Sequence, residues 1–387
     1  MPDSARLRRR LVSDLRRDGF LSDDRVAAAF ATVPRHEFVP DQPKKDVYTD
    51  RAFITKQVDG VPTSSSSQPS IMALMLEQLD VAPGMRVLEI GAGTGYNAAL
   101  IANLAGPDGR VVAVDIDPEV AEGARTHLDA AGYNGHIEIV TADGGFGHPP
   151  MAPYDRIIAT AGCWQIPQPW IEQLAEGGLI VLPFRLNGAH VSLALRKHGD
   201  ELLSVRAEMC GFMPLRGAFG PTYDIRTRDA LISSDVELPP ALRKSLPKLL
   251  RDGRSVRLPY PRARDESNTP LYFFALQGLP IVRVITRTDS WGPTPFTLIA
   301  SPRSAIALPW QRPNRGRVDI FGDDAAFEFT RDALARWHAD GKPDLRQLRL
   351  RVRSSRARLG ALPRPSYNGN GYRFRRGEHR YEMWFER

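Results

Sequence analysis

A glycine-rich loop is the feature of this sequence that most directly implies chemistry. Gly91, Gly93 and Gly95 form the run GAGTGY, which follows an expected strand at 86–90 and precedes an expected helix at 97–105. A glycine loop in this context lets backbone N–H groups approach a nucleotide-like ligand at the N-terminus of the helix. The run alone is a weak signal, because a tight turn that binds nothing has the same composition.

Three acidic residues at expected strand ends make the glycine loop more specific. Glu89 lies two residues before Gly91, and a carboxylate there would repel a dinucleotide pyrophosphate but suits a cofactor that carries an ammonium and a sulfonium. Asp115 ends the next strand, where an acidic side chain accepts hydrogen bonds from ribose hydroxyls. Asp143 follows the third strand, where its carboxylate or nearby backbone can reach an adenine edge. We therefore predict S-adenosylmethionine as the cofactor and S-adenosylhomocysteine as the product, with NAD as a weaker alternative and no metal.

The expected elements alternate between strand and helix, which places the glycine loop and the acids at one edge of a sheet. Short apolar runs predict strands at 86–90, 111–117, 136–143, 154–162 and 179–184. Helices are predicted at 70–79, 97–105, 118–132 and 166–178, and a closing hairpin at 191–199 and 202–212. The pattern predicts an α/β fold with a Rossmann-like, doubly wound parallel sheet and an antiparallel edge strand.

Residues 1–60 are expected to form a helical cap and a loop at the start of a domain that spans 1–217. Two short helices are predicted within the first 40 residues, and Ser22 is expected to cap the second. The stretch 39–67 is polar, contains three prolines and shows no periodicity. We therefore expect a long irregular loop there, and loops of this length are usually functional or disordered.

The charge of the chain is unevenly distributed along its length. Residues 1–217 hold 21 basic and 27 acidic residues, whereas residues 218–387 hold 31 basic and 18 acidic residues. We expect a linker at 218–238 and a basic α+β domain at 239–387. Such a domain suggests an acidic partner, namely nucleic acid, a membrane surface or an acidic peptide, although a solvated arginine surface would give the same counts.

The overall composition excludes several classes of protein. Hydrophobic residues make up 42% and charged residues 25% of the chain, as in ordinary globular proteins, so a largely disordered or collagenous chain is excluded. The two cysteines, Cys163 and Cys210, form no C-x-x-C pair, which argues against a zinc site and favours a reducing compartment. No apolar run approaches the roughly 18 residues that a membrane helix needs. We expect a cytoplasmic enzyme without a membrane partner.

The order of several segments resembles the protein-L-isoaspartate O-methyltransferase family. RVAAAFATVPRHEFVP, YTDRA and SQPSIMALMLEQL are similar to the family's entry segment, its next landmark and its active-site loop with the following helix. VLEIGAGTGY, VVAVDID, TADGGFG, YDRIIATAG, IPQPWIEQLAEGG and CGFMPLRG follow in the family's order. The resemblance extends from about residue 20 to residue 217, and the ordered series is more specific than any single motif.

The resemblance implies a Rossmann-like methyltransferase that transfers a methyl group from S-adenosylmethionine to a carboxylate of an aspartyl or isoaspartyl residue in a peptide or protein. It places in the cofactor site Glu89, Gly91, Gly93, Asp115 and Asp143. Ser67 falls on the family's active-site serine, and we expect the nearby Ser66 and Ser70 to bind the substrate. Without the resemblance, a helix N-cap would be the first explanation for Ser67.

Three departures from the family pattern all concern the substrate rather than the cofactor. Ser70 stands where the family usually has His or Tyr, and the stretch between Arg51 and Ser67 is longer than usual. The basic C-terminal domain is additional. What these departures leave open is therefore the substrate and not the chemistry.

The departures favour a dedicated peptide substrate. Arg349, Arg351 and Arg353 share one face of an expected strand, and their guanidinium groups suit an acidic peptide. We predict that the C-terminal domain delivers one aspartate of a precursor peptide to the site, and that the ester then closes to an aspartimide. The alternatives are a general L-isoaspartyl repair enzyme and, more remotely, a nucleic-acid methyltransferase. The domain could also serve only in dimerisation, and the sequence does not determine the oligomeric state.

Overall fold

The chain forms two compact units. The structure, a computed structural model, describes residues 4–133, 135–186, 189–220, 223–226, 230–234, 238–251, 253–258, 273, 281–286, 296–308, 317–354 and 371–386. Unit 1 comprises Met1–Pro183 and Ser192–Gly220, and unit 2 comprises Phe184–Val191 and Pro221–Arg387.

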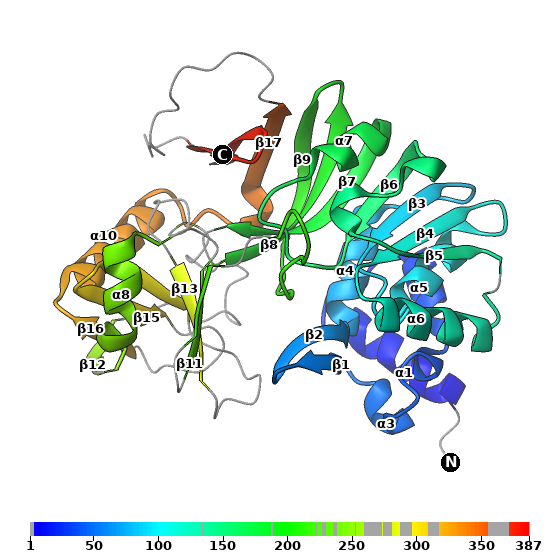
Figure 1. The fold of residues 1–387 in the computed structure, drawn as a ribbon, viewed down its shortest axis with the longest axis horizontal. Helices are drawn as coiled ribbons and strands as arrows, with labels where there is room; N and C mark the ends of the chain where they lie inside the picture. The colour runs from blue at the N-terminus through cyan, green and yellow to red at the C-terminus, as the bar shows by residue number, and fades with distance from the viewer. Residues whose placement is uncertain are drawn as a thin grey trace. The chain divides into compact units, whose positions relative to one another are not determined.

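Unit 1 is built on a mixed sheet whose central strands are parallel (Figure 1). The parallel strands, in sheet order, are β5 (Ile137–Thr141), β4 (Arg110–Asp115), β3 (Arg86–Ile90), β6 (Tyr154–Ala159) and β7 (Leu174–Leu186). β8 (Ala189–His198) and β9 (Glu201–Met209) extend this order, and the short connections between them require antiparallel pairing. The predicted α/β sheet with an antiparallel edge is confirmed.

Helices bury the central strands of unit 1. α1 (Ser4–Arg17), α2 (Asp24–Thr32), α4 (Pro69–Leu79), α5 (Tyr96–Ala105) and α6 (Pro118–Ala130) contribute side chains to one apolar cluster with the sheet. The shorter helical elements are η1 (Arg35–Glu37), α3 (Lys44–Val47), η2 (Gly144–Phe146), η3 (Pro149–Met151) and α7 (Gln168–Gln173). β3 and β4 are buried after their first residue, which explains their nearly continuous apolar sequences.

One cap differs from the sequence-based prediction. Asp23, and not Ser22, is the N-cap of α2, because its carboxylate accepts hydrogen bonds from the backbone N–H groups of Arg25 and Val26. Ser22 instead donates its hydroxyl to Glu77 on α4. The two residues together fix the start of α2 and tie it to the next long helix.

A β-hairpin replaces the second half of the irregular loop that was predicted for residues 39–67. β1 (Phe53–Val58) pairs with β2 (Val61–Ser66) in antiparallel register. Asp59 and Gly60 join the strands, and both have a positive φ, of 51° and 74°. A two-residue turn of this kind matches the twist of a hairpin, and Asp-Gly is one of its preferred sequences. The prediction of a loop was wrong here because it overlooked this dipeptide.

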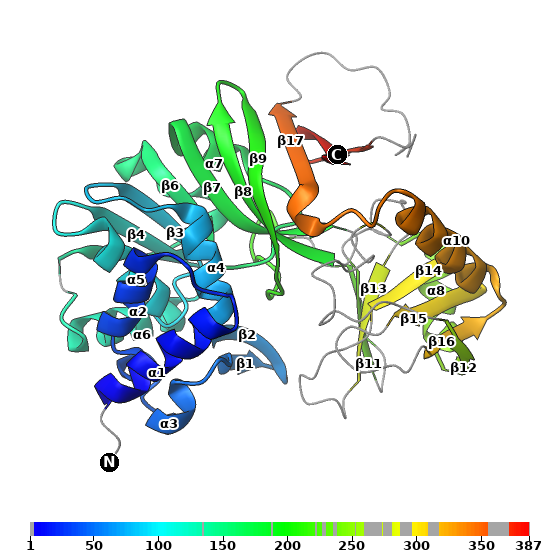
Figure 2. The same ribbon diagram turned by 180° about the vertical axis from the view of Figure 1, so that it is seen from behind.

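Unit 2 contains a second sheet in which every pairing is antiparallel (Figure 2). Its strands, in sheet order, are β10 (Tyr223–Arg226), β11 (Ala230–Ser234), β13 (Ile281–Thr286), β14 (Phe296–Ser301), β15 (Ser304–Leu308), β16 (Arg317–Gly322) and β12 (Gly253–Arg257). α8 (Pro240–Leu249) packs apolar residues onto this sheet, and α10 (Ala325–Ala339) contacts β14 and β15. The predicted linker at 218–238 therefore contains two paired strands, because β10 and β11 form one edge of the sheet.

Three further strands complete unit 2. After η4 (Leu345–Gln347), β17 (Leu348–Ser354) pairs with β19 (His379–Phe385), which also pairs with β18 (Tyr372–Arg376). The rings of Phe374 and Tyr381 stack with centroids 4.9 Å apart, and Phe184 lies 5.5 Å from Tyr381. The apolar run LYFFAL at 271–276 predicts a strand, but of these residues the structure describes Phe273 alone. Within the described part of the chain, no helix combines the length and apolar character needed to cross a membrane.

Candidate active site

The glycine loop between β3 and α5 has a backbone that only glycine adopts easily. Gly91 and Gly93 have φ values of 97° and 53°. A Cβ atom on Gly91 would lie 2.6 Å from Oγ1 of Thr160, and one on Gly93 would lie 3.4 Å from the carbonyl oxygen of Ser65. The loop therefore contacts the residue that follows β6 and the β1–β2 hairpin, and a side chain at Gly91 would collide with Thr160.

Glu89 is a fully buried carboxylate at the end of β3. Its Oε1 atom accepts a hydrogen bond of 2.8 Å from the side-chain amide of Asn97 on α5, whereas its Oε2 atom has no hydrogen-bond partner. Burial raises the pKa of Glu89 to about 8, the Asn97 hydrogen bond opposes this shift, and the charge of Asp115 adds to it. A buried carboxyl group with an unpaired oxygen fits a cationic group of a ligand, because such a group would compensate the cost of burial.

Asp115 ends β4 and closes the other side of the glycine loop. Its two carboxylate oxygens accept hydrogen bonds of 3.1 Å from the N–H groups of Gly93 and Asp117. Burial raises the pKa of Asp115, and these two backbone hydrogen bonds oppose the shift. The carboxylate is thus held rigidly beside the loop, and each oxygen retains the capacity to accept a further hydrogen bond from a ligand hydroxyl.

Asp143 follows β5, and each of its two carboxylate oxygens accepts a hydrogen bond from a backbone N–H group. Oδ1 accepts from the N–H of Gly145 at 2.9 Å, and Oδ2 accepts from the N–H of Ala218 at 2.8 Å. A Cβ atom at Gly217 would lie 2.3 Å from Oδ2, so this approach requires glycine. Phe219 then packs edge-on against Phe146, with ring centroids 5.4 Å apart. Asp143 therefore fastens the last segment of unit 1 to the end of β5.

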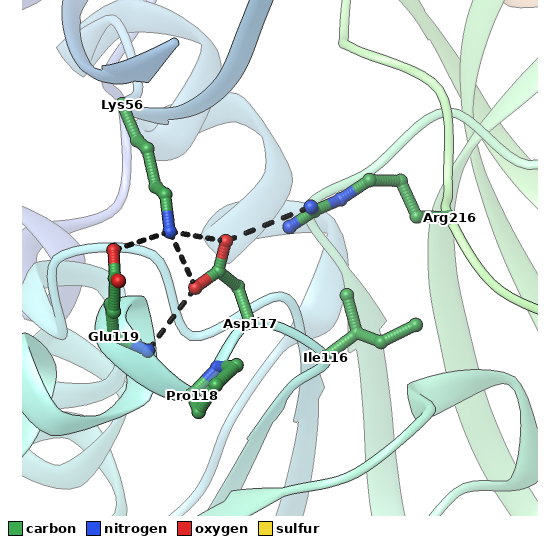
Figure 3. Close-up of a pocket in the computed structure, with 6 residues that line it drawn as sticks. All are labelled: Lys56, Ile116, Asp117, Pro118, Glu119 and Arg216. Atoms are coloured by element: carbon green, nitrogen blue, oxygen red, sulfur yellow. Dashed lines mark hydrogen bonds and ion pairs between the residues drawn. The ribbon is translucent and has the colours of Figure 1, made fainter. Parts of the chain in front are cut away.

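A pocket of about 330 Å³ lies next to these acids (Figure 3). Its lining residues are Lys56, Ile116, Asp117, Pro118, Glu119 and Arg216. The Lys56 ammonium lies 2.8 Å from Asp117 and 2.7 Å from Glu119, and it holds the pKa of Asp117 below its ordinary value. Arg216 lies 3.8 Å from both Asp115 and Asp117. Two cations from distant parts of the sequence thus face the acids that follow β4.

The serine run occupies β2 and the residues after it. Ser66 is buried, and its hydroxyl has no hydrogen-bond partner. Ser67 is partly exposed and directly precedes Gln68, the N-cap of α4, which makes no side-chain capping bond. Ser70 is buried in the first turn of α4. The helix-cap explanation for Ser67 is therefore wrong. Ser67 remains the predicted active-site serine, and Ser66 and Ser70 remain predicted substrate-binding residues.

Two residues that the sequence analysis did not single out hold this region in place. Asp50 accepts hydrogen bonds of 2.8 Å from the backbone N–H of Ser70 and the side chain of Gln68, so it caps α4 from a distance. Arg35 is fully buried and donates to the carbonyl oxygens of Arg51 and Ser67, which flank the hairpin, at 2.9 and 2.8 Å. Burial lowers the pKa of Arg35. No sequence signal marked the second of these roles, because Arg35 stands in the polar run Arg35–His36–Glu37 and binds backbone carbonyls.

The three predicted substrate arginines lie on β17 in unit 2. Their side chains alternate with the buried Leu348, Leu350 and Val352, so they share one face as predicted. Arg349 lies 2.5 Å from Glu386, and Arg351 lies 3.7 Å from Glu382 and over the ring of Trp384. At least two of these charges therefore already have acidic partners within the same unit.

Comparisons with known proteins agree with the geometry of unit 1. Residues 6–219 match the family described as protein-L-isoaspartate(D-aspartate) O-methyltransferase. The chain is 41% identical over 218 residues to a protein-L-isoaspartate O-methyltransferase from Methanopyrus kandleri, which covers 56% of this chain and 93% of that protein. It is 42% identical over 214 residues to the enzyme of the same name from Methanoregula boonei, covering 55% and 94% of the two chains.

A solved structure matches a larger part of the chain. The structure, titled protein-L-isoaspartate O-methyltransferase, has a TM-score of 0.53 and 28% sequence identity. The match covers 89% of this chain and 96% of the chain in that structure. A match of that extent continues beyond residue 220, so the C-terminal extension has a counterpart in at least one relative. The chain belongs to the protein-L-isoaspartate O-methyltransferase family, and it is an S-adenosylmethionine-dependent protein carboxyl O-methyltransferase.

Proposed function

We propose that this chain methylates the α-carboxylate of L-isoaspartyl residues in proteins and peptides, as a general repair methyltransferase. The observation that carries the proposal is the buried Glu89, whose Oε2 atom has no partner beside the glycine loop. The family match over residues 6–219 supports the reaction.

The cofactor is expected to lie along the loops that follow β3, β4 and β5. When bound, S-adenosylmethionine supplies a methyl group on a positively charged sulfur. Glu89 would pair with a cationic group of the cofactor, and Asp115 would accept hydrogen bonds from its ribose hydroxyls. Each oxygen of Asp143 accepts one backbone hydrogen bond and can accept another, so this carboxylate or the neighbouring backbone would contact the adenine edge.

The substrate needs positioning rather than proton transfer. A carboxylate is already ionised at neutral pH, since its reference pKa is near 4. Forming the O–CH3 bond and breaking the S–CH3 bond neutralises one negative and one positive charge and releases no proton. The hydroxyls of Ser66 and Ser67 would hold the carboxylate, and a water-poor site strengthens the attraction between the two charges.

Two observations favour general repair over a dedicated acidic peptide. A relative's structure matches 89% of the chain, so a C-terminal extension is not peculiar to this protein. Arg349 and Arg351 have acidic partners in Glu386 and Glu382, so their charges need no acidic peptide. The predicted precursor peptide and aspartimide product gain no support from either observation.

The experiment uses two synthetic peptides of identical sequence, one with an L-isoaspartyl and one with an L-aspartyl residue. Transfer of a labelled methyl group should occur on the L-isoaspartyl peptide and stay at background on the other. Several unrelated L-isoaspartyl sequences should be methylated at similar rates. Methylation confined to one acidic L-aspartyl peptide would instead support the dedicated-substrate alternative, and labelling of RNA would overturn the carboxyl assignment.

A further inference from the structure

The first strand of the β1–β2 hairpin has little apolar packing to hold it in place. Phe53 is the only buried residue of β1, and Ile54 and Val58 are 39% and 49% exposed. A segment with few buried apolar contacts opens more easily than the core. Arg35 fixes the base of the hairpin through the carbonyls of Arg51 and Ser67. A polar contact is therefore needed nearer the turn if the hairpin is to keep one position.

Lys56 makes that contact at an irregular point of the hairpin. The strand register shifts on both sides of Lys56, which lies opposite Ser64. Such β-bulges redirect a side chain and are frequent beside active sites. Here the redirected ammonium reaches Asp117, the N-cap of α6, and Glu119 in its first turn. In Figure 3 it lies between these two carboxylates at the pocket.

The same hairpin carries the serine run against the glycine loop. The carbonyl oxygen of Ser65 lies 3.4 Å from the place where a Cβ atom of Gly93 would be. Asp117 is linked through its N–H to Asp115, the expected ribose acceptor. Lys56 therefore connects the strand next to the substrate serines with the acids next to the cofactor pocket.

We infer that Lys56 is a positioning residue that clamps the β1–β2 hairpin over the cofactor pocket and thereby slows the release of the cofactor product. The inference rests on the proposed cofactor site. Lys56 acts through the hairpin and through Asp117 and Glu119, and it needs no direct contact with the reacting atoms. Because the clamp is an ion pair, salt should weaken it.

The test measures S-adenosylhomocysteine release from the full chain by stopped-flow, at low and at high salt. Lys56→Met keeps an unbranched side chain one atom shorter and removes its charge, so release should accelerate about three- to fivefold, as expected for the loss of two ion pairs. In the wild type, salt should accelerate release, whereas in Lys56→Met salt should have little further effect. Lys56→Arg keeps the charge and should behave like the wild type.

Hydrogen exchange supplies a second readout that needs no ligand. The backbone amides of residues 53–66 should exchange faster in Lys56→Met than in the wild type, while those of β3 and β4 stay unchanged. Lys45→Met removes the charge of an exposed lysine on α3 and serves as the matched control, for which release and exchange should not change.

The results distinguish failure of the proposed cofactor site from failure of the Lys56 clamp. If the wild type does not bind S-adenosylhomocysteine, the proposed cofactor site fails. If the wild type binds it but Lys56→Met matches the wild type in release, salt response and exchange, the clamp is refuted. Should Lys56→Met fold poorly, Glu119→Gln removes one of the two partners at an exposed position, and release unchanged in that variant would refute the clamp as well.

Discussion

Glu89 in unit 1 and Arg349 in unit 2 are both charged residues that the sequence analysis expected to meet a ligand of opposite charge. The structure shows that the two side chains differ in burial and in pairing. Glu89 is fully buried, and one of its oxygens has no partner, whereas Arg349 lies 2.5 Å from Glu386. Ionising a buried carboxyl group without a cationic partner costs several kcal/mol, which raises the pKa of Glu89, while a paired charge near the surface costs almost nothing. Burial without a partner is therefore the stronger indication of a ligand.

The net charge of a long segment does not show which of its charged side chains are already paired. The excess of basic residues after residue 217 suggested an acidic partner, yet acidic residues of unit 2 lie beside several of the arginines. Arg373 lies 2.7 Å from Glu382, and Arg254 pairs with Asp324. The comparison predicts large effects on ligand binding for changes at the acids of unit 1 and small effects for changes at the arginines of β17.

The largest effect is expected for Asp115→Ala. The change removes the expected acceptor for ribose hydroxyls and also leaves the N–H groups of Gly93 and Asp117 without their carboxylate. A hydrogen bond to a charged group contributes about 1.5–3 kcal/mol, so the affinity for S-adenosylhomocysteine should fall roughly 10- to 100-fold. Calorimetric titration of the purified protein with S-adenosylhomocysteine measures this affinity.

The control for Asp115→Ala is Asp129→Ala, which removes an exposed carboxylate from the end of α6. The control should bind S-adenosylhomocysteine as the wild type does. An unchanged affinity in Asp115→Ala would remove the ribose role, and equal losses in both variants would point to an effect of net charge rather than of this site.

A pH dependence that originates at Glu89 is the next largest effect. Its pKa of about 8 means that the ligand-free protein carries a neutral Glu89 at pH 6–7, and pairing with a cationic ligand requires that proton to leave. Affinity for S-adenosylhomocysteine should therefore rise with pH up to about 8, by at most about tenfold per pH unit, and then level off. Calorimetric titrations with S-adenosylhomocysteine in buffers of different ionisation enthalpy should show that binding releases a proton at pH 7.

Glu89→Gln tests whether the pH dependence belongs to this residue. The variant keeps an oxygen that can accept from Asn97 but cannot become negatively charged. Its affinity should be nearly independent of pH between 6 and 8, and the difference from the wild type should be greatest at pH 8. A variant that retains the wild-type slope would assign the titration to another group.

The central sheet could be predicted from sequence because burial dictates composition there. β3 and β4 are buried strands, and their apolar runs have no other simple explanation. The β1–β2 hairpin could not be found in the same way, since most side chains of β1 are exposed and apolar alternation is absent. Only the Asp59–Gly60 turn signalled it, through a backbone conformation rather than through hydrophobicity.

Spacing along the sequence says more about the cofactor side of the candidate site than about its substrate side. Gly91 and Glu89 lie at the end of one strand, so spacing along the chain reports their proximity. Arg35 binds backbone carbonyls, which no sequence pattern specifies, and the hydrogen bond from Ala218 to Asp143 spans 75 residues. Interactions of this kind depend on the tertiary fold, and their partners can be identified only once the fold is known.

A smaller effect is expected for the serines, and it should appear in turnover rather than in cofactor affinity. The buried Ser66 hydroxyl has no partner, so Ser66→Ala loses no hydrogen bond in the free protein. If both hydroxyls hold the substrate carboxylate, each alanine variant should lower turnover on an L-isoaspartyl peptide about 5- to 30-fold, the equivalent of one hydrogen bond of about 1–2 kcal/mol. Unchanged turnover in Ser67→Ala, with a loss in Ser66→Ala, would transfer the predicted catalytic role to Ser66.

The smallest effect is expected for the double variant Arg349→Gln and Arg351→Gln. These side chains pair with Glu386 and Glu382, so their loss should change the free energy of unfolding by no more than about 1 kcal/mol for each pair. Turnover on neutral and on acidic L-isoaspartyl peptides should change less than twofold and to the same extent. A tenfold loss of turnover confined to the acidic peptide would show that a paired arginine can still exchange its partner for a substrate. Burial without a partner would then no longer distinguish ligand-binding residues of unit 1 from the arginines of unit 2.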